Sequence, residues 1–216
     1  MDYNAARHNM VESQIRPNRV TDPLVMSAMA EVPREAFLPK SLRGVAYVDE
    51  DIPLGNGRHM MEPLVLARLL QGAEIAPSDM VLVIGCATGY CSAVLARMAN
   101  TVVALESDHG LAEAATATLG EQGIDTVACV EGALRDGYAK QGPYDVIFFC
   151  GAVPEVPPAI RNQLSEGGRM VAVISEGPMG KAVLVTRRDG LFSSLEKFDA
   201  AIPLLPGFET EPSFVF

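Results

Sequence analysis

The chain has 216 residues, a length that suits one domain, and a net charge of −10. Hydrophobic residues make up 49% and charged residues 20% of the chain, which is enough apolar material for a core and excludes extensive disorder. A protein this acidic has no general attraction for phosphate backbones, which argues against a nucleic-acid partner. No apolar run reaches membrane-spanning length, and the first ten residues lack the features of a signal peptide. We therefore expect a cytoplasmic protein without a membrane partner.

The four cysteines have spacings that match no zinc-binding pattern, so the sequence predicts no metal site. They are Cys86, Cys91, Cys129 and Cys150. Three of them lie beside or inside apolar runs, and we expect small buried side chains in a reducing compartment. Nothing in the sequence indicates an oligomeric state.

Two helices are predicted near the N-terminus, over residues 4–18 and 22–31. Thr21 or Asp22 can cap the second helix, and Pro23 suits its first turn. These helices indicate an N-terminal extension that precedes the main domain.

A polar, turn-rich stretch follows over residues 45–63. Its three acidic residues, Asp49 to Asp51, lack the glycine and spacing of a calcium loop, so we expect them to be solvated. A further helix is predicted over 63–72, and Gly72 is expected to stop it.

From Met80 onward, short uninterrupted apolar runs alternate with helical patterns. The predicted strands cover 80–85, 101–106, 125–132, 144–151, 167–175 and 181–188, and the predicted helices cover 90–99, 110–123 and 134–139. Runs without polar interruptions are typical of strands buried on both faces of a parallel sheet. The last two strands are joined by the loop 176–180, and 200–216 is expected to add an edge strand.

These elements predict a single α/β domain over residues 1–216, with a doubly wound, mostly parallel sheet and helices on both faces. Residues 1–79 would hold the N-terminal helices and a loop of the functional site, and residues 80–216 would form the core.

A glycine-containing loop, Gly85–Gly89, joins the first predicted strand of the core to its helix. Glu106 ends the next strand, 21 residues after Gly85. An acidic side chain there can accept hydrogen bonds from ribose hydroxyls, and the helix N-terminus can face an anionic group. The loop lacks the full G-x-G-x-x-G spacing of dinucleotide enzymes. A shorter loop with a following acid favours an S-adenosylmethionine site, and an ordinary glycine turn is the alternative.

The motif VLVIGCATGYCSAVLA resembles the first cofactor motif of protein-L-isoaspartate O-methyltransferases, commonly VLEIGTGSGYQAAVLA. NMVESQI, AMAEVPREAFLP, AYVDEDIPLGNG and YDVIFFCGAVPEVPPAIRNQLSEGGRMV also resemble segments of that family, so the resemblance covers about residues 9–190. It implies a Rossmann-like class I methyltransferase that transfers a methyl group from S-adenosylmethionine to the abnormal carboxylate of an isoaspartyl residue. S-adenosylhomocysteine would be the product, and the acceptor would be a protein or peptide carboxylate or another small acceptor.

The resemblance also implies two groups of site residues. The cofactor-binding residues would be Gly85, Cys86, Ala87, Gly89, Glu106, Gly132 and Ala133. The acceptor loop would contain Arg58, His59, Met61 and Glu62. Arg58 and His59 could offer cations to an acidic acceptor.

The sequence departs from the family pattern at four places. The active-site loop commonly reads GQTISQP, and here Met61 stands where the serine belongs and is followed by Glu62. Val83 replaces an acid ahead of the glycine loop, and Ala87 replaces the loop's middle glycine. Ala133 replaces an aspartate that would bond the adenine amino group. A thioether donates no hydrogen bond, and Glu62 would repel an anionic acceptor.

Three functions are therefore compatible with the sequence. The first is a carboxyl methyltransferase of the isoaspartyl type. The second is a methyltransferase of the same fold that acts on a different acceptor. The third is a non-catalytic relative that binds a partner. We expect activity on isoaspartyl peptides to be absent or far below that of the family.

Overall fold

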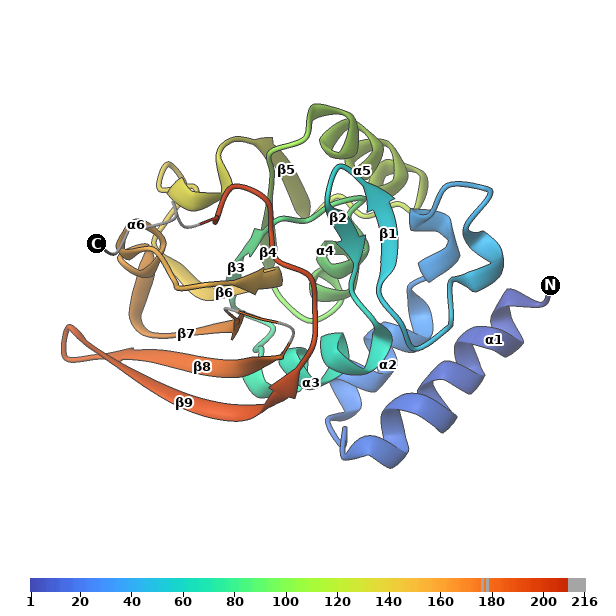
Figure 1. Ribbon diagram of the computed structural model, residues 1–216, viewed down its shortest axis with the longest axis horizontal. Coiled ribbons are helices and arrows are strands. Elements are labelled where there is room, and N and C mark those ends of the chain that lie inside the picture. The colour runs from blue at the N-terminus through green and yellow to red at the C-terminus, as the bar shows by residue number, and fades with distance from the viewer. Residues whose placement is uncertain (176, 178, 210–216) are drawn as a thin grey trace, which may run out of the picture.

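The centre of the computed structural model, which describes residues 1–175, 177 and 179–209, is a seven-stranded sheet (Figure 1). The strand order is β5-β4-β3-β6-β7-β8-β9. The strands are β3 (Met80–Ile84), β4 (Thr101–Glu106), β5 (Val127–Glu131), β6 (Tyr144–Val153), β7 (Leu164–Ile174), β8 (Gly180–Arg188) and β9 (Leu191–Ala200). Strands β3 to β7 pair in parallel, and β8 and β9 add an antiparallel edge.

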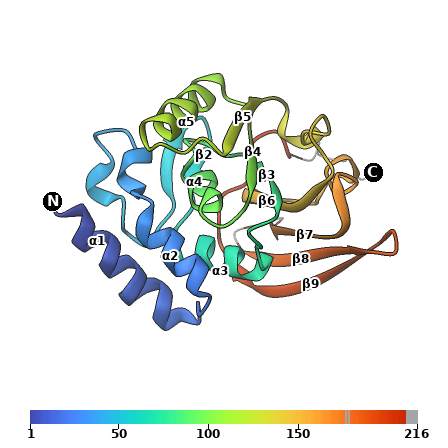
Figure 2. The same cartoon turned by 180° about the vertical axis from the view of Figure 1, so that it is seen from behind.

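Alternate residues of the central strands enter two hydrophobic cores. Val81 and Val83 pack with the helices α3 and α4, whereas Leu82 and Ile84 pack with Ile160 of α6. The helices are α3 (Pro63–Ala73), α4 (Tyr90–Ala96), α5 (His109–Glu121) and α6 (Pro158–Arg161), with a 3-10 turn η5 (Leu134–Asp136). Figures 1 and 2 show α3, α4 and α5 on the side of the sheet that faces the N-terminal elements. Burial on both faces explains the uninterrupted apolar runs, and the doubly wound α/β prediction is confirmed.

The N-terminal elements form a layer on α3 and α4. They are α1 (Tyr3–Asn9), the π-helical turn η1 (Met10–Ile15), the 3-10 turns η2 (Arg16–Asn18), η3 (Arg34–Phe37) and η4 (Arg43–Val45), and α2 (Pro23–Glu31). The helix expected over 4–18 is therefore α-helical only in its first part. The second helix is confirmed, and Asp22 caps it by accepting from the Leu24 amide at 2.8 Å.

The turn-rich stretch 45–63 contains a β-hairpin that the sequence analysis did not predict. Strand β1 (Ile52–Gly55) pairs with β2 (Arg58–Met60), and Asn56 and Gly57 join them with φ of 50° and 70°. An Asn-Gly pair favours this tight hairpin turn, so the signal was present in the sequence. The hairpin lies beside the glycine loop and brings Arg58 to it.

Gly72 does not stop α3, because the helix continues to Ala73 and ends at Glu74, whose φ is 49°. The guanidinium of Arg169 donates to the carbonyl oxygens of Ala73 at 2.9 Å and Glu74 at 2.8 Å. These bonds satisfy carbonyls at the helix end, a contact with a distant strand that the local sequence does not show.

The edge strand lies earlier in the chain than expected. β9 pairs with β8 across the turn Asp189-Gly190, whereas the described part of 200–216 beyond β9 contributes only an isolated bridge from Leu204 to Ala152. Residues 210–216 lie outside the described residues. Most β9 side chains are exposed or half-buried, so the strand lacks the apolar run that identified the others.

The turn from β3 into α4 uses three left-handed backbone positions. Gly85, Ala87 and Gly89 have φ of 77°, 50° and 94°. Glycine adopts this region without penalty, but at Ala87 it costs roughly 1–2 kcal/mol. The loop therefore places a residue with a side chain in a backbone conformation that suits glycine.

We expect Ala87→Gly to raise the free energy of unfolding by up to about 1 kcal/mol, measured by urea denaturation. Relief of the left-handed strain outweighs the roughly 0.4–1 kcal/mol that glycine adds to the unfolded-state entropy. Ala93→Gly, inside α4 and fully buried, is the control and should lower stability by about 1 kcal/mol or more. A loss of stability in Ala87→Gly would contradict the strain.

Candidate functional site

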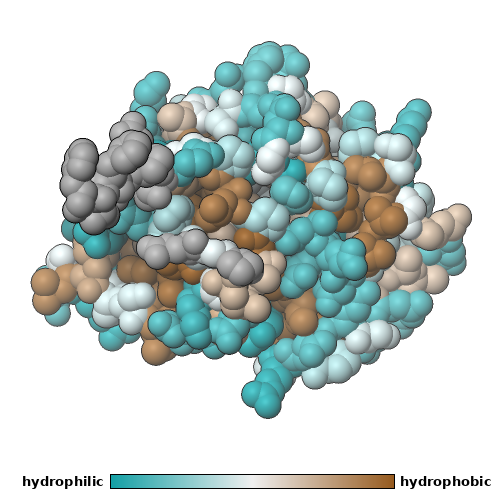
Figure 3. All heavy atoms as spheres, viewed as in Figure 1, coloured by the Kyte–Doolittle hydropathy of each residue, from teal (hydrophilic) through white to brown (hydrophobic). Residues whose placement is uncertain are grey.

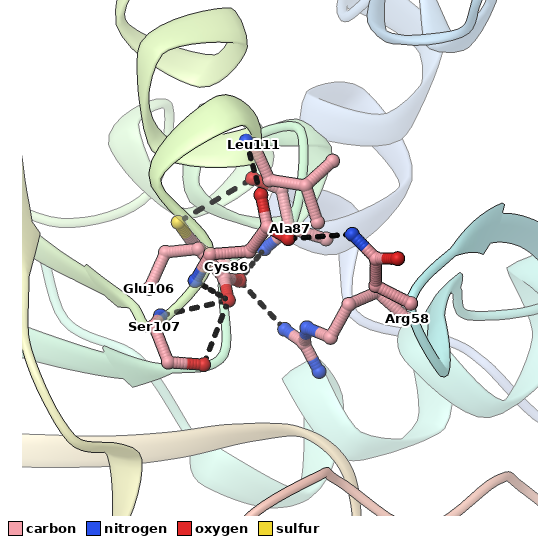
Figure 4. Close-up of polar contacts among 8 residues, drawn as sticks. Arg58, Cys86, Ala87, Glu106, Ser107 and Leu111 are labelled. Atoms are coloured by element: carbon pink, nitrogen blue, oxygen red, sulfur yellow. Dashed lines mark hydrogen bonds and ion pairs between the residues drawn. The ribbon is translucent and has the colours of Figure 1, made fainter.

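The carboxylate of Glu106, at the end of β4, is the most densely bonded group at the carboxyl ends of the parallel strands. Its side chain is fully buried. One oxygen, Oε2, accepts from the Ala87 amide and from Nη2 of Arg58, each at 2.7 Å. The other, Oε1, accepts from the amides of Ser107 at 2.8 Å and Asp108 at 3.2 Å (Figure 4). Both oxygens are thus fully engaged by the chain itself.

Arg58 reaches this carboxylate from the β1–β2 hairpin. Its side chain is 3% exposed, so the ion pair with Glu106 is shielded from water. Asn56, at the hairpin turn, donates to Asp108 at 2.7 Å, and Asp108 also caps α5 by accepting from the Leu111 amide at 3.0 Å. The hairpin is therefore fastened to the loop after β4 at two points.

The segment after β9 covers the same end of the sheet. The Ala152 amide of β6 donates to the Pro203 carbonyl at 2.9 Å, and the Leu205 amide donates to the Ala152 carbonyl at 2.8 Å. The Leu205 side chain is buried and lies against two glycines: a Cβ added at Gly85 or Gly151 would lie 2.9 or 2.6 Å from its Cδ2. The same Gly85 Cβ would lie 2.7 Å from Nη2 of Arg58.

The space left between these groups is small. A cavity of about 10 Å³, lined by Arg58, His59, Met61, Gly151 and Leu205 among others, holds roughly one water molecule. Figure 3 shows one face of the molecule, on which hydrophobic and hydrophilic side chains are intermixed. Small-molecule sites typically enclose about 300–1,000 Å³. The Glu106 carboxylate expected for the ribose hydroxyls is in place, but in this conformation the chain's own side chains leave only this small space, so the described residues do not fit S-adenosylmethionine as they stand.

The structure brings most of the predicted cofactor residues to this end of the sheet. Gly85 lies under Arg58 and Leu205, Ala87 bonds Glu106, and the Gly132 amide donates to the Glu106 carbonyl at 3.0 Å. Ala133 follows Gly132 and begins the turn η5, and Gly89 begins α4 and packs against Ala115. Their binding role stays a prediction.

The Cys86 side chain is buried and its Sγ lies 3.7 Å from the Ala87 carbonyl oxygen. A hydrogen bond with the Cys129 thiol and burial raise the pKa of the Cys86 thiol well above its usual value. All four cysteines are free thiols, and Cys129 and Cys150 are only partly buried. Cys86 therefore presents a neutral, buried side chain beside the loop.

The acceptor loop places Met61 and Glu62 at the start of α3. Met61 is buried, and its carbonyl oxygen accepts from Nη2 of Arg34 at 2.7 Å. The Glu62 amide donates to Asp51 at 2.9 Å. Burial, followed by the charges of Asp51 and Asp49, raises the pKa of Glu62 to about 7. The loop thus has a carboxyl group that changes charge near neutral pH.

Asp49 and Glu50 are exposed, as expected, and Asp51 is half-buried, but Asp49 and Asp51 also have a role that was not predicted. Asp49 accepts from the Leu64 amide at 3.1 Å and Asp51 from the Glu62 amide, so the two carboxylates satisfy free amides at the N-terminus of α3. Asp51 is half-buried, and burial raises its pKa. Two acids shortly before a helix that begins with proline are the signal that could have identified this cap.

Leu205 lies at this site although no sequence pattern indicates it. It stands in the stretch Ile202–Phe208, which reads as a proline-rich end. Its packing on Gly85 and Gly151 depends on the return of the chain to β6. Only the folded structure brings these three residues together.

Candidate membrane-spanning helices and metal-binding clusters are both absent from the described residues. None of the helices in the described part of the chain is long and apolar enough to cross a membrane. Within the same residues, no cluster of three or more His, Cys, Asp or Glu side chains could hold a metal ion.

Comparisons with known sequences identify the relatives of the chain. A family model described as protein-L-isoaspartate(D-aspartate) O-methyltransferase matches residues 5–201. A protein-L-isoaspartate O-methyltransferase of Koribacter versatilis is 35% identical over 200 residues, which cover 92% of this chain and 90% of that protein. Its counterpart in Methylorubrum extorquens is 39% identical over 189 residues, or 87% of this chain and 82% of that protein.

Comparisons with solved structures agree. A protein-L-isoaspartate O-methyltransferase structure superposes with a TM-score of 0.83 and 27% identity, covering 94% of this chain and 67% of that one. A Plasmodium falciparum structure of the same kind, in complex with S-adenosyl-L-homocysteine, has a TM-score of 0.79 at 18% identity and shows the shared fold. The match to the family model over nearly the whole chain, together with these relatives, shows that the chain belongs to the protein-L-isoaspartate(D-aspartate) O-methyltransferase family.

Proposed function

We propose that the protein is an S-adenosylmethionine-dependent carboxyl methyltransferase that acts on isoaspartyl residues of peptides or proteins, at a rate limited by its acceptor loop. The observation that carries the proposal is the family match over residues 5–201. The glycine loop and the buried Glu106 at the end of β4 support it, because a carboxylate in this position suits ribose hydroxyls.

The acceptor carboxylate of such a substrate is ionised at pH 7, so no residue has to remove a proton from it. The protein has to hold the carboxylate in line with the methyl group, which requires hydrogen-bond donors. Met61 has no donor on its side chain, and the Glu62 amide is bonded to Asp51. The acceptor loop is therefore poor in donors where the family commonly has a serine.

Nε of Arg58 and Nδ1 of His59 are buried acceptor-loop nitrogens without a hydrogen-bond partner in the described part of the chain, and His59 is the residue that we assign to the acceptor. It lies on β2, lines the small cavity, and has a buried Nδ1 without a hydrogen-bond partner in the described part of the chain. Arg58, its neighbour, is engaged with Glu106. His59 is thus the side chain that best suits an acceptor carboxylate in the loop as it stands.

The first test is methyl transfer to an isoaspartyl peptide and to its normal aspartyl twin. We expect the double variant Met61→Ser/Glu62→Gln to methylate the isoaspartyl peptide faster than the unmodified protein, by about 10²–10³-fold, because a well-placed donor at a reacting oxygen has that effect. The aspartyl peptide should stay unreactive in both proteins. Fast, selective methylation by the unmodified protein, with no gain in the variant, would show that the loop supplies its donors in another way.

The raised pKa of Glu62 predicts a pH dependence. Below about pH 7 its carboxyl group is neutral, and above that pH it is ionised and repels an acceptor carboxylate, which is ionised throughout this range. We therefore expect kcat/KM for the isoaspartyl peptide to fall as the pH rises from 6 to 8.

Glu62→Gln is the matched control, because glutamine keeps the shape of the side chain but does not titrate. The measurement is kcat/KM across this range for both proteins. The fall near pH 7 should be absent from the Gln variant. If both proteins give the same profile, Glu62 does not face the acceptor.

A further inference from the structure

We propose that this chain closes its own methyl-donor site with Arg58 and Leu205, so that S-adenosylmethionine binds only after these side chains move away. The inference rests on the proposed function, since it concerns the donor of that reaction. The chain belongs to a family that uses this donor, but the protein's own side chains fill the space at the site.

The first closing group is the guanidinium of Arg58. It bonds the same oxygen of Glu106 that accepts from the Ala87 amide, while the other oxygen is taken by the amides after β4 (Figure 4). A ribose hydroxyl could reach this carboxylate only by replacing one of these donors. Arg58 is the donor on a side chain from another element, so it is the one that can leave without unfolding the loop.

The second closing group is the side chain of Leu205. It lies on Gly85 of the glycine loop and on Gly151 of β6, at distances where an added Cβ would clash with it. A glycine in such a loop lets a ligand approach the backbone closely. Here the approach is made by a leucine of the same chain, and the cavity that remains is about 10 Å³.

The segment that carries Leu205 is attached to the sheet by few backbone hydrogen bonds, although Leu205 and Phe208 are buried. Two backbone hydrogen bonds to Ala152 hold the segment that carries Leu205, and Phe208 adds an edge-to-face contact with Phe149 at 6.1 Å between ring centroids. The segment has no strand of its own, only the bridge at Leu204. Opening therefore requires a local displacement and leaves the sheet intact.

A site that is open in only a fraction of molecules binds its ligand with an apparent Kd raised by the inverse of that fraction. Weakening the closed form should therefore tighten binding without any new contact to the ligand. S-adenosyl-L-homocysteine is the suitable probe, because its binding requires no acceptor and no turnover.

The first experiment is calorimetry of the full-length chain with S-adenosyl-L-homocysteine. We expect Leu205→Ala to lower the Kd at least 10-fold, and Leu195→Ala, an exposed leucine on β9, to leave it unchanged. An unchanged or higher Kd in Leu205→Ala would overturn the proposal. It would also be overturned if neither the unmodified protein nor Leu205→Ala bound the probe.

Arg58→Met tests the other group, since methionine keeps the apolar stem and removes the guanidinium. We expect at least a 10-fold lower Kd here also. An unchanged or higher Kd in a folded Arg58→Met protein would refute the role of Arg58. If this variant does not fold, Leu205→Ala decides the proposal alone.

Hydrogen exchange gives a readout that a merely structural role of Leu205 would not move. At a concentration of S-adenosyl-L-homocysteine tenfold above the Kd, the amides of Ala152 and Leu205 should exchange faster, because their hydrogen bonds to the carbonyls of Pro203 and Ala152 are broken on opening. The amides of β3 serve as the internal reference. Ligand binding without faster exchange at these two positions would contradict displacement of the segment.

The outcomes separate this inference from the proposed function. Tighter binding in Leu205→Ala with no methylation of any isoaspartyl peptide would keep the closed site and reject the acceptor. Methylation by the unmodified protein with a Kd that Leu205→Ala does not change would keep the function and reject the closed site.

Discussion

The buried carboxylate of Glu106 is the constraint on which the arrangement of the site depends. An ionised group removed from water has to be matched by hydrogen-bond donors or by a counter-charge, and Glu106 has both in the loop amides and in Arg58. The same contacts fix three separate segments relative to each other: the glycine loop, the start of α5 and the β1–β2 hairpin. A ligand that takes the place of Arg58 must offer comparable donors. Neutral hydroxyls form weaker bonds than a guanidinium does, so the closed form is a real competitor.

The glycine loop combines left-handed backbone positions with a close approach by the chain's own side chains. Gly85 and Gly89 adopt left-handed conformations as the motif predicts, and Ala87 follows them although its methyl group makes this unfavourable. The Ala87 amide compensates by donating to Glu106 at 2.7 Å. The room above Gly85, however, is used by Arg58 and Leu205. A loop with these left-handed positions can therefore occur in a site that does not admit S-adenosylmethionine until Arg58 and Leu205 move away.

An element could be predicted from the sequence where a local pattern specifies it, and could not where a long-range contact does. β3, β4 and β6 were predicted because burial on both faces leaves a continuous apolar run. β9 was not predicted because its side chains are mostly exposed. The hairpin that carries Arg58 was not predicted either, although its Asn56-Gly57 turn favours a hairpin. Glu106 was found from its spacing after the glycine loop. Its pairing with Arg58 joins residues 48 positions apart, and no local pattern specifies such a contact.

Acidic residues near the acceptor loop affect both the fold and the charge of the site. Asp49 and Asp51 stabilise the start of α3 by accepting from its amides, and burial together with their charges raises the pKa of Glu62 to about 7. Acids that serve the fold thus determine the electrostatics that an acceptor meets. A carboxylate entering this loop meets three acidic groups, while Arg58 is paired with Glu106 and Arg34 donates to the Met61 carbonyl. Arg58 lines the same small cavity as Asp51 and Met61, so its release from Glu106 would alter the charge that an acceptor meets as well as the donor site.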